Sequence, residues 1–309
     1  EVAARHALAA AGLETTDLDL IVMATVTPEI SCPSNACVLQ ERLGAVNAGA
    51  FDLNAACSGF VYGFATATSL VASGVARRIL LVGVEKLHFF LDYRDRNSCV
   101  IFGDGAGAVI IEHSDQADVG VLGVDLGADG PAGSTMVIPT LGTRGELSTF
   151  RDPSQHRLHF EGQAVYKIAV KGMAESVTRA LERASLDADD IDLVVPHQAN
   201  LRIIQAATSR LGVPESKVMV NIADHGNTSA ASIPMALCDA LDEGRISPHD
   251  TIAITAFGGG VTWGSVIFRW GERVSRCETS DAALPEPTGD VFDVLAPNRE
   301  FYSSYHESN

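Results

Sequence analysis

The chain has 309 residues, of which 46% are hydrophobic and 20% charged, and its formal net charge is −17 at pH 7. This acidity excludes general nucleic-acid binding, which needs a basic face, and no apolar run reaches the roughly 18 residues of a membrane span. The six cysteines are scattered, with no CxxC pair or Cys/His cluster. The sequence therefore predicts reduced thiols, a cytoplasmic protein and no metal site.

The N-terminal residues 1–13, EVAARHALAAAGL, predict an amphipathic helix and not a signal peptide, because a basic start and a continuous apolar stretch are missing. The pattern that follows occurs twice, 173 positions apart. It reads ALAAAGLETTDLDLIV at 7–22 and ALERASLDADDIDLVV at 180–195. Each copy predicts the end of a helix, a short turn, an Asp-rich cap and a buried strand.

Later matches keep the same order along the chain. Arg42-Leu-Gly pairs with Arg210-Leu-Gly, and GDGAGAVII at 103–111 pairs with GGGVTWGSVIF at 258–268. The sequence thus predicts two copies of a helix–strand–helix–strand–strand unit, with sheets covered by helices; chance similarity between two α/β segments is the alternative. Because GDGAG leads into a strand, it is a tight turn and not a dinucleotide-binding loop.

The two copies differ at their beginnings. The second has a strand-like lead, VGVLGVDLG at 119–127, whereas the first begins inside its helix. We therefore expect that the first strand of the unit is absent and that the sequence is an N-terminally truncated piece.

Cys57 lies in NAACSG, between an apolar run that ends at Leu53 and a long apolar segment, 60–72. A helix start carries partial positive charge and free N–H groups, which lower the pKa of a thiol. This position predicts a nucleophile, and a packed core cysteine is the alternative. Around an offset of 170, Cys57 corresponds to Asn227, so the two helix starts are expected to meet at a pseudo-symmetry axis.

Three further candidates lie at strand ends or turns. His197 follows a buried strand that ends at Pro196, a position that often holds catalytic groups but also structural histidines. Asn227 lies in DHGNTSAASIP at 224–234, where it faces a site or caps a helix. The run Phe257-Gly-Gly-Gly260 offers unobstructed backbone N–H groups that can complete an oxyanion hole.

Together these motifs resemble the thiolase-fold condensing enzymes, and most closely the β-ketoacyl-acyl carrier protein synthase III family. The matching stretches are AACSGF at 55–60, IFGDGAGAV at 101–109, VPHQANLRII at 195–204, HGNTSAASIP at 225–234 and AFGGGVTWGS at 256–265.

The resemblance covers about residues 1–270 and implies an α/β, duplicated thiolase-like fold, layered α-β-α-β-α, with two pseudo-symmetric halves at 1–114 and 115–270. Residues 271–309 carry eight Asp/Glu and three Arg and lie outside the family core. They predict a flexible acidic tail.

The resemblance further implies a triad of Cys57, His197 and Asn227. Cys57 would take an acyl group from an acyl-CoA, and the N–H groups of Cys57 and Gly259 would bind the oxyanion. His197 and Asn227 would then hold the thioester carbonyl of malonyl-acyl carrier protein as CO₂ leaves, with Phe257 as a shield. The resulting carbanion would attack the acyl group and give a β-ketoacyl product. No cofactor is implied besides the acyl-CoA substrate.

Other positions take their expected roles from the same resemblance. Cys32 stands where family members often have a bulky phenylalanine that reaches across the dimer, which implies a homodimer with a wider acyl pocket. Asn97 and Gln163 replace the usual Gly and Asn and are expected to alter contacts with CoA. Docking of an acidic carrier protein on an acidic enzyme needs a local basic patch, for which Lys171 and Arg210 are additional candidates. The expected CoA-arm contacts are Arg96, Gln163, Tyr166, Ala199 and Asn200, and the expected carrier-protein contacts are Arg202 and Lys167.

Two other functions remain open at this point. A thiolase-fold acyltransferase of a secondary pathway would keep the triad but use a small-molecule acceptor. A non-catalytic partner subunit would have no need for Cys57. The triad does not distinguish fatty-acid from polyketide synthesis, since both use it.

Overall fold

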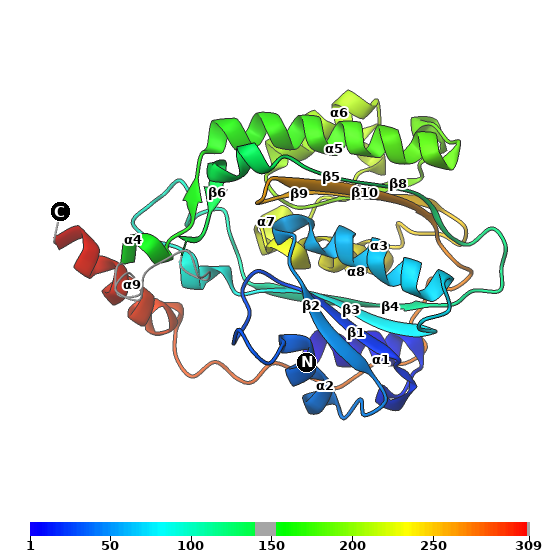
Figure 1. Ribbon diagram of the computed structural model, residues 1–309, viewed down its shortest axis with the longest axis horizontal. Helices are drawn as coiled ribbons and strands as arrows, with labels where there is room; N and C mark the ends of the chain where they lie inside the picture. Colours follow the sequence, from blue (N-terminus) through cyan, green and yellow to red (C-terminus); the bar gives the residue numbers. More distant parts are fainter. Residues whose placement is uncertain (140–152, 308–309) are drawn as a thin grey trace.

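The computed structural model describes residues 1–139 and 153–307. Five layers of helices and sheets succeed one another in the order α-β-α-β-α, as Figure 1 shows. The fold class implied by the resemblance is therefore confirmed. Within the described part of the chain, none of the helices is both long and apolar enough to cross a membrane.

The first half forms the lower sheet of Figure 1 and the helices below it. The strand order is β2-β1-β3-β4, with β4 antiparallel to β3 and the other pairs parallel. Its elements are α1 (Val2–Ala11), β1 (Leu20–Ala24), α2 (Asn35–Leu43), β2 (Gly49–Leu53), α3 (Gly59–Ala72), β3 (Arg78–Glu85) and β4 (Gly105–Glu112).

The second half forms the upper sheet, in the order β5-β10-β9-β8, with α5 and α6 above it. Its main elements are β5 (Gly120–Ala128), α5 (Gly162–Ala184), β8 (Leu193–Pro196), α6 (Leu201–Leu211), α8 (Ser232–Asp242), β9 (Thr251–Gly258) and β10 (Thr262–Arg269). Short elements complete it: β6 (Met136–Val137), α4 (Pro153–His156), β7 (His159–Phe160) and α7 (Ile222–His225).

The central layer consists of α3 and α8, which lie between the two sheets (Figure 1). Because both faces of α3 are covered, its side chains are apolar on most sides, and Phe60 and Val61 are fully buried. They share one core with Ile233 of α8 and Ile254 of β9. The apolar segment recognised in the sequence at 60–72 is thus the helix that joins the halves.

The internal repeat is confirmed in the backbone. Strands β3 and β9 begin at residues 78 and 251, 173 positions apart. Two 3₁₀ turns that precede the central helices have the same offset: η2 (Ala56–Ser58) and η9 (Ser229–Ala231). Their first residues share an unusual conformation, with φ 46° at Ala56 and φ 50° at Ser229.

The expected equivalence of Cys57 with Asn227 is therefore wrong, because the counterpart of Cys57 at this offset is Ala230. The offset of 170 holds only after the central helices, at the left-handed glycines Gly74 and Gly244. The reason is that α8 has 11 residues where α3 has 14.

The C-terminal segment differs from the loose appendage that its acidity predicts. It contains α9 (Val291–Glu307), in which Tyr302 is only 2% exposed. The Asn298 amide donates a 2.8 Å hydrogen bond to the carbonyl oxygen of His88. The buried Tyr302 and the partly buried Leu295 and Ala296 explain the difference, since they give an otherwise exposed helix contacts with the rest of the chain.

Gly83 marks the closest approach between β3 and the η9 turn. A Cβ at this position would lie 2.3 Å from the carbonyl oxygen of Ala230. Gly83→Ala is therefore expected to lower the free energy of unfolding by about 1–3 kcal/mol, because the backbone must shift. Urea denaturation checks this, with Gly130→Ala as the control: a Cβ on Gly130 meets nothing within 4 Å. Equal stability of the two variants would contradict the prediction.

Candidate active site

A cavity of about 500 Å³ collects residues that are far apart in the sequence. Cys57, His197, Asn227 and Phe257 all line it, so the three sequence motifs and the glycine loop meet at one place. The cavity is also lined by five of the residues expected to contact CoA or the carrier protein: Gln163, Tyr166, Ala199, Asn200 and Arg202.

Four predicted site residues do not line this cavity as the described residues define it: Arg96, Lys167, Gly259 and Cys32. Arg96, Lys167 and Cys32 are exposed. Gly259 is adjacent instead, because a Cβ on it would lie 3.6 Å from the Cβ of Ala56, beside the cysteine. Asn97, the neighbour of Arg96, does line the cavity.

Cys57 lies in the short η2 turn between β2 and α3 and is 7% exposed. Burial raises the pKa of its thiol to about 12, and the hydrogen bond with Ser229 offsets this only in part. The expectation of a lowered pKa at a helix start is wrong, because loss of hydration disfavours the thiolate more than the turn stabilises it.

His197 follows β8 and is 1% exposed. Its backbone N–H donates to the carbonyl oxygen of Thr255 at 2.7 Å, and its Nδ1 lies 2.6 Å from the hydroxyl oxygen of Ser232. Burial lowers the pKa of His197 to about 3, so the ring is neutral at physiological pH. The backbone N–H of Gln198 donates to the same hydroxyl oxygen, which leaves the Ser232 hydrogen able to donate to Nδ1. In this arrangement Nε2 carries the ring proton.

Asn227 is 5% exposed and is held by two backbone hydrogen bonds, with Ile101 and Gly103. Its Oδ1 accepts from the backbone N–H of Ser229 at 2.9 Å, and its Nδ2 lies 3.5 Å from the carbonyl oxygen of Ala199. Its oxygen thus holds the first residue of the η9 turn, and the residue also lines the cavity.

The glycine loop after β9 touches the turn that carries the cysteine. A Cβ on Gly258 would lie 2.8 Å from the backbone nitrogens of Cys57 and Ser58. Only glycine permits this approach, which brings two sets of backbone N–H groups together at the cysteine.

The sequence interpretation missed a buried polar group beside Cys57. Glu85, at the end of β3, is 2% exposed and accepts hydrogen bonds from the Thr27 hydroxyl and the Val26 backbone N–H. The Ser229 hydroxyl oxygen lies 3.1 Å from Glu85 Oε1 and 3.3 Å from the Cys57 sulfur. Burial raises the pKa of Glu85 to about 7. The signal in the sequence was an acidic residue placed directly after the apolar run 79–84 of β3.

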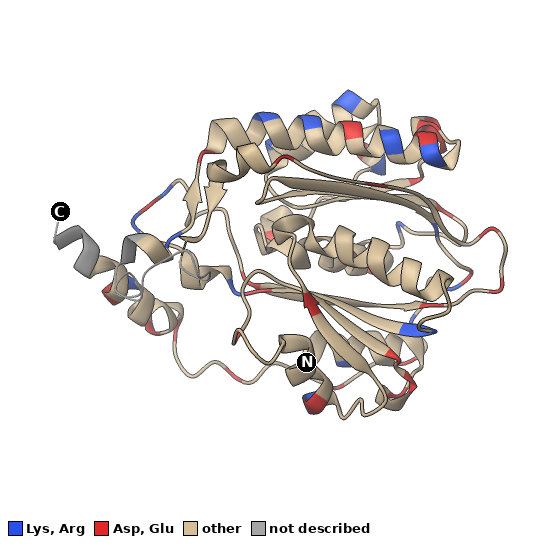
Figure 2. Ribbon diagram, in the orientation of Figure 1, with Lys and Arg blue, Asp and Glu red and all other residues tan. Residues whose placement is uncertain are grey.

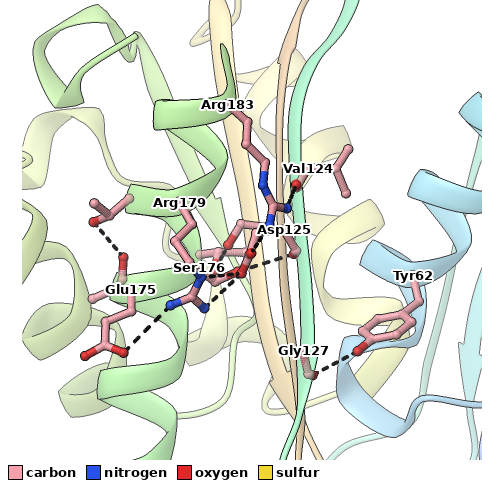
Figure 3. Close-up of polar contacts among 12 residues, drawn as sticks. Tyr62, Val124, Asp125, Gly127, Glu175, Ser176, Arg179 and Arg183 are labelled. Atoms are coloured by element: carbon pink, nitrogen blue, oxygen red, sulfur yellow. Dashed lines mark hydrogen bonds and ion pairs between the residues drawn. The ribbon is translucent and has the colours of Figure 1, made fainter. Parts of the chain in front are cut away.

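Basic residues recur along α5 and α6, on the outer side of the upper sheet (Figure 2). Arg179 and Arg183 of α5 turn inward and pair with the buried Asp125 at 2.9 and 3.2 Å (Figure 3). Lys167 and Arg202 are exposed and have no ion pair with any residue that the structure describes. The basic residues thus comprise two arginines that neutralise a buried carboxylate and an exposed group without such a partner among the described residues.

Residues 1–139 and 153–307 contain no group of three His, Cys, Asp or Glu side chains able to hold a metal ion.

Comparisons with known proteins agree on one family. The model described as 3-oxoacyl-[acyl-carrier-protein (ACP)] synthase III matches residues 51–130, and the model of its C-terminal part matches residues 181–270. The β-ketoacyl-[acyl-carrier-protein] synthase III 2 of Vibrio cholerae is 43% identical over 296 residues, which are 96% of this chain and 81% of the relative.

Solved structures give the same result. The 3-oxoacyl-[acyl-carrier-protein] synthase III of Aquifex aeolicus is 41% identical, with a TM-score of 0.80 over 86% of this chain and 82% of the relative. The priming β-ketosynthase of the R1128 polyketide pathway is 34% identical, with a TM-score of 0.80 over 87% of this chain and 80% of that chain.

Proposed function

Because the chain belongs to the β-ketoacyl-[acyl-carrier-protein] synthase III family, we propose that its cavity condenses an acyl-CoA starter with malonyl-acyl carrier protein. The reaction releases CO₂ and gives a β-ketoacyl-acyl carrier protein, which initiates fatty-acid synthesis. The observation that carries this function is the single cavity that joins a buried cysteine, a neutral histidine and an asparagine amide.

In the first half-reaction, the Cys57 sulfur attacks the thioester carbonyl of the acyl-CoA. The oxygen of that carbonyl becomes an oxyanion, for which the N–H groups of Cys57 and Gly259 are the proposed donors. Support comes from the contact between the glycine loop and the η2 turn. The C–S bond to CoA then breaks and leaves an acyl-Cys57 thioester.

In the second half-reaction, Nε2 of His197 and Nδ2 of Asn227 donate to the thioester oxygen of malonyl-acyl carrier protein. A neutral histidine with its proton on Nε2 suits this role, because it stabilises the enolate without giving up its proton. Loss of CO₂ leaves a carbanion that attacks the acyl-Cys57 carbonyl. Phe257, which is buried at the cavity wall, is the proposed shield against water.

The proposed partners are the CoA arm of the donor, the carrier protein and a second copy of this chain. Four residues that line the cavity, together with the exposed Arg96, are the proposed contacts of the CoA arm: Gln163, Tyr166, Ala199 and Asn200. The exposed Lys167 and Arg202 are the proposed contacts of the acidic carrier protein. The active form is proposed to be a homodimer, in which Cys32 of one chain reaches the acyl pocket of the other.

The test is the intact mass of the protein after incubation with acyl-CoAs from acetyl to long and branched chains. We expect a mass gain that maps to Cys57 and disappears, with release of CO₂, when malonyl-acyl carrier protein is added. A gain that only a small-molecule acceptor removes would replace this function by that of a secondary-pathway acyltransferase. No gain with any donor would point to a non-catalytic subunit.

Cys32 provides a test of the pocket. It is exposed in the single chain and is smaller than phenylalanine. Cys32→Phe is expected to reduce the acylation rate with long or branched donors about tenfold relative to acetyl-CoA, since a bulkier side chain shortens the pocket. The same mass assay measures this, and Cys37→Phe, at another exposed cysteine, is the control. An unchanged chain-length preference would remove Cys32 from the acyl pocket.

A further inference from the structure

A continuous line of hydrogen bonds connects the nucleophile to a buried carboxyl group. Ser229 lies between the two, with its hydroxyl oxygen 3.3 Å from the Cys57 sulfur and 3.1 Å from Glu85 Oε1. All three residues are buried. They come from three separate segments: the η2 turn, the η9 turn and the end of β3.

Acylation of Cys57 requires a place for its proton. Burial holds the thiol pKa near 12, so the thiolate is rare at neutral pH. His197 is a poor acceptor, because burial keeps its pKa near 3 and its Nδ1 is already bonded to Ser232. The triad alone therefore offers no good acceptor for the thiol proton of Cys57.

The number of available hydrogens decides which group donates and which accepts between Cys57, Ser229 and Glu85. An ionised carboxylate only accepts hydrogen bonds, and Glu85 also accepts from the Thr27 hydroxyl at Oε2 and from the Val26 N–H at both of its oxygens. The Ser229 hydroxyl has a single hydrogen. When it donates to Glu85 Oε1, its oxygen accepts from the thiol of Cys57, so both hydrogens point toward the carboxylate.

The backbone holds Ser229 in this position. Its φ of 50° is in the left-handed region, which a residue other than glycine adopts at a cost that the surroundings must offset. The hydrogen bond from its N–H to Asn227 Oδ1, at 2.9 Å, fixes the same residue to the triad. The serine is thus oriented by main-chain contacts that remain when its hydroxyl is removed.

We propose that Glu85, acting through the Ser229 hydroxyl, receives the thiol proton of Cys57 as the cysteine attacks its acyl donor. This inference rests on the proposed acyl transfer. As the new S–C bond forms, the S–H bond breaks, the proton passes to the Ser229 oxygen, and the Ser229 hydrogen passes to Glu85 Oε1. When the C–S bond of the donor breaks, the departing thiolate takes a proton back along the same line. Glu85 ends the step ionised, and the donor leaves as a neutral thiol.

The test compares Glu85→Gln, Ser229→Ala and the double variant in the intact protein at pH 8. Two rates are measured by mass spectrometry: alkylation of Cys57 by iodoacetamide, which needs no acyl transfer, and acylation by acetyl-CoA. Controls are Asp125→Asn, at a buried carboxylate bonded to arginines (Figure 3), and Ser176→Ala, at another buried serine. The alkylation of exposed Cys37 is the internal reference.

We expect alkylation of Cys57 to be about tenfold slower and acylation about 100-fold slower in both single variants, as for loss of a general base. The double variant should be no slower than either, because both residues serve one route. The controls should stay within about threefold of the wild type. Condensation by enzyme acylated in advance should also be unaffected, since that step uses His197 and Asn227.

Glu85→Gln distinguishes proton transfer from a purely electrostatic role. The negative charge of Glu85 raises the pKa of Cys57, so its removal alone would produce more thiolate and faster alkylation. Faster or unchanged alkylation, or multiplicative effects in the double variant, would overturn the proposal. If acetyl-CoA acylates none of the proteins but alkylation slows as expected, the proton route stands and the donor assigned under the proposed function is wrong.

Discussion

Cys57→Ala is expected to lower acyl incorporation from any acyl-CoA at least about a thousandfold, because Cys57 is the one cysteine among the described residues that line the cavity. Decarboxylation of malonyl-acyl carrier protein should remain within about tenfold of the wild-type rate, since His197 and Asn227 still line the cavity. Intact mass measures the first rate, and ¹⁴CO₂ release from labelled malonyl groups measures the second.

The matched control is Cys37→Ala, at an exposed cysteine on α2, which should acylate at the wild-type rate. Retained incorporation in Cys57→Ala would show that another residue takes the acyl group. Loss of both activities, in a variant with the wild-type melting temperature, would indicate that the thiol also helps to position the malonyl group.

The second large effect is expected on condensation when Asn227 is replaced. Asn227→Ala is expected to slow condensation about 100- to 1,000-fold, as for removal of one oxyanion donor, while acylation of Cys57 stays within about tenfold. The two steps are separated by acylating the enzyme first, removing the donor, and then adding malonyl-acyl carrier protein. The decay of acyl-enzyme mass gives the condensation rate.

Asn227→Asp separates the two roles of this side chain. Its carboxylate can still accept from the N–H of Ser229, as Oδ1 does now at 2.9 Å, but it cannot donate to a substrate. Both variants should therefore lose condensation. If the aspartate variant retained it, Asn227 would act only as the cap of the η9 turn.

The sequence predicts which residues come together where a motif lies on one strand end or turn. Cys57, His197 and Asn227 each follow a recognisable local pattern, and the structure brings them to one cavity. Local patterns cannot predict the degree of burial, which depends on contacts between the halves. For this reason the shift of the Cys57 pKa has the opposite sign to the sequence-based expectation.

Contacts between distant segments could not be predicted from local sequence patterns, for the same reason. Glu85 and Ser229 are 144 positions apart, and neither stands out until β3 and η9 are packed together. The repeat is visible in the sequence, but the lengths of its two central helices, 14 and 11 residues, are not, and the offset changes across them. In the C-terminal segment, the acidic composition does not reveal that Tyr302 of α9 is buried against the rest of the chain.

The duplicated backbone has a consequence for how the active site divides its tasks. At the common offset of 173, Cys57 corresponds to Ala230, Ala56 to Ser229 and Glu85 to Gly258. Each short turn packs against the strand end of the other half. At one of these junctions the glycine leaves room for the cysteine backbone, and at the other the glutamate binds the serine hydroxyl. Two geometrically equivalent corners thus carry different side chains: the thiol of the proposed nucleophile Cys57 at one, and the carboxyl group of Glu85 at the other.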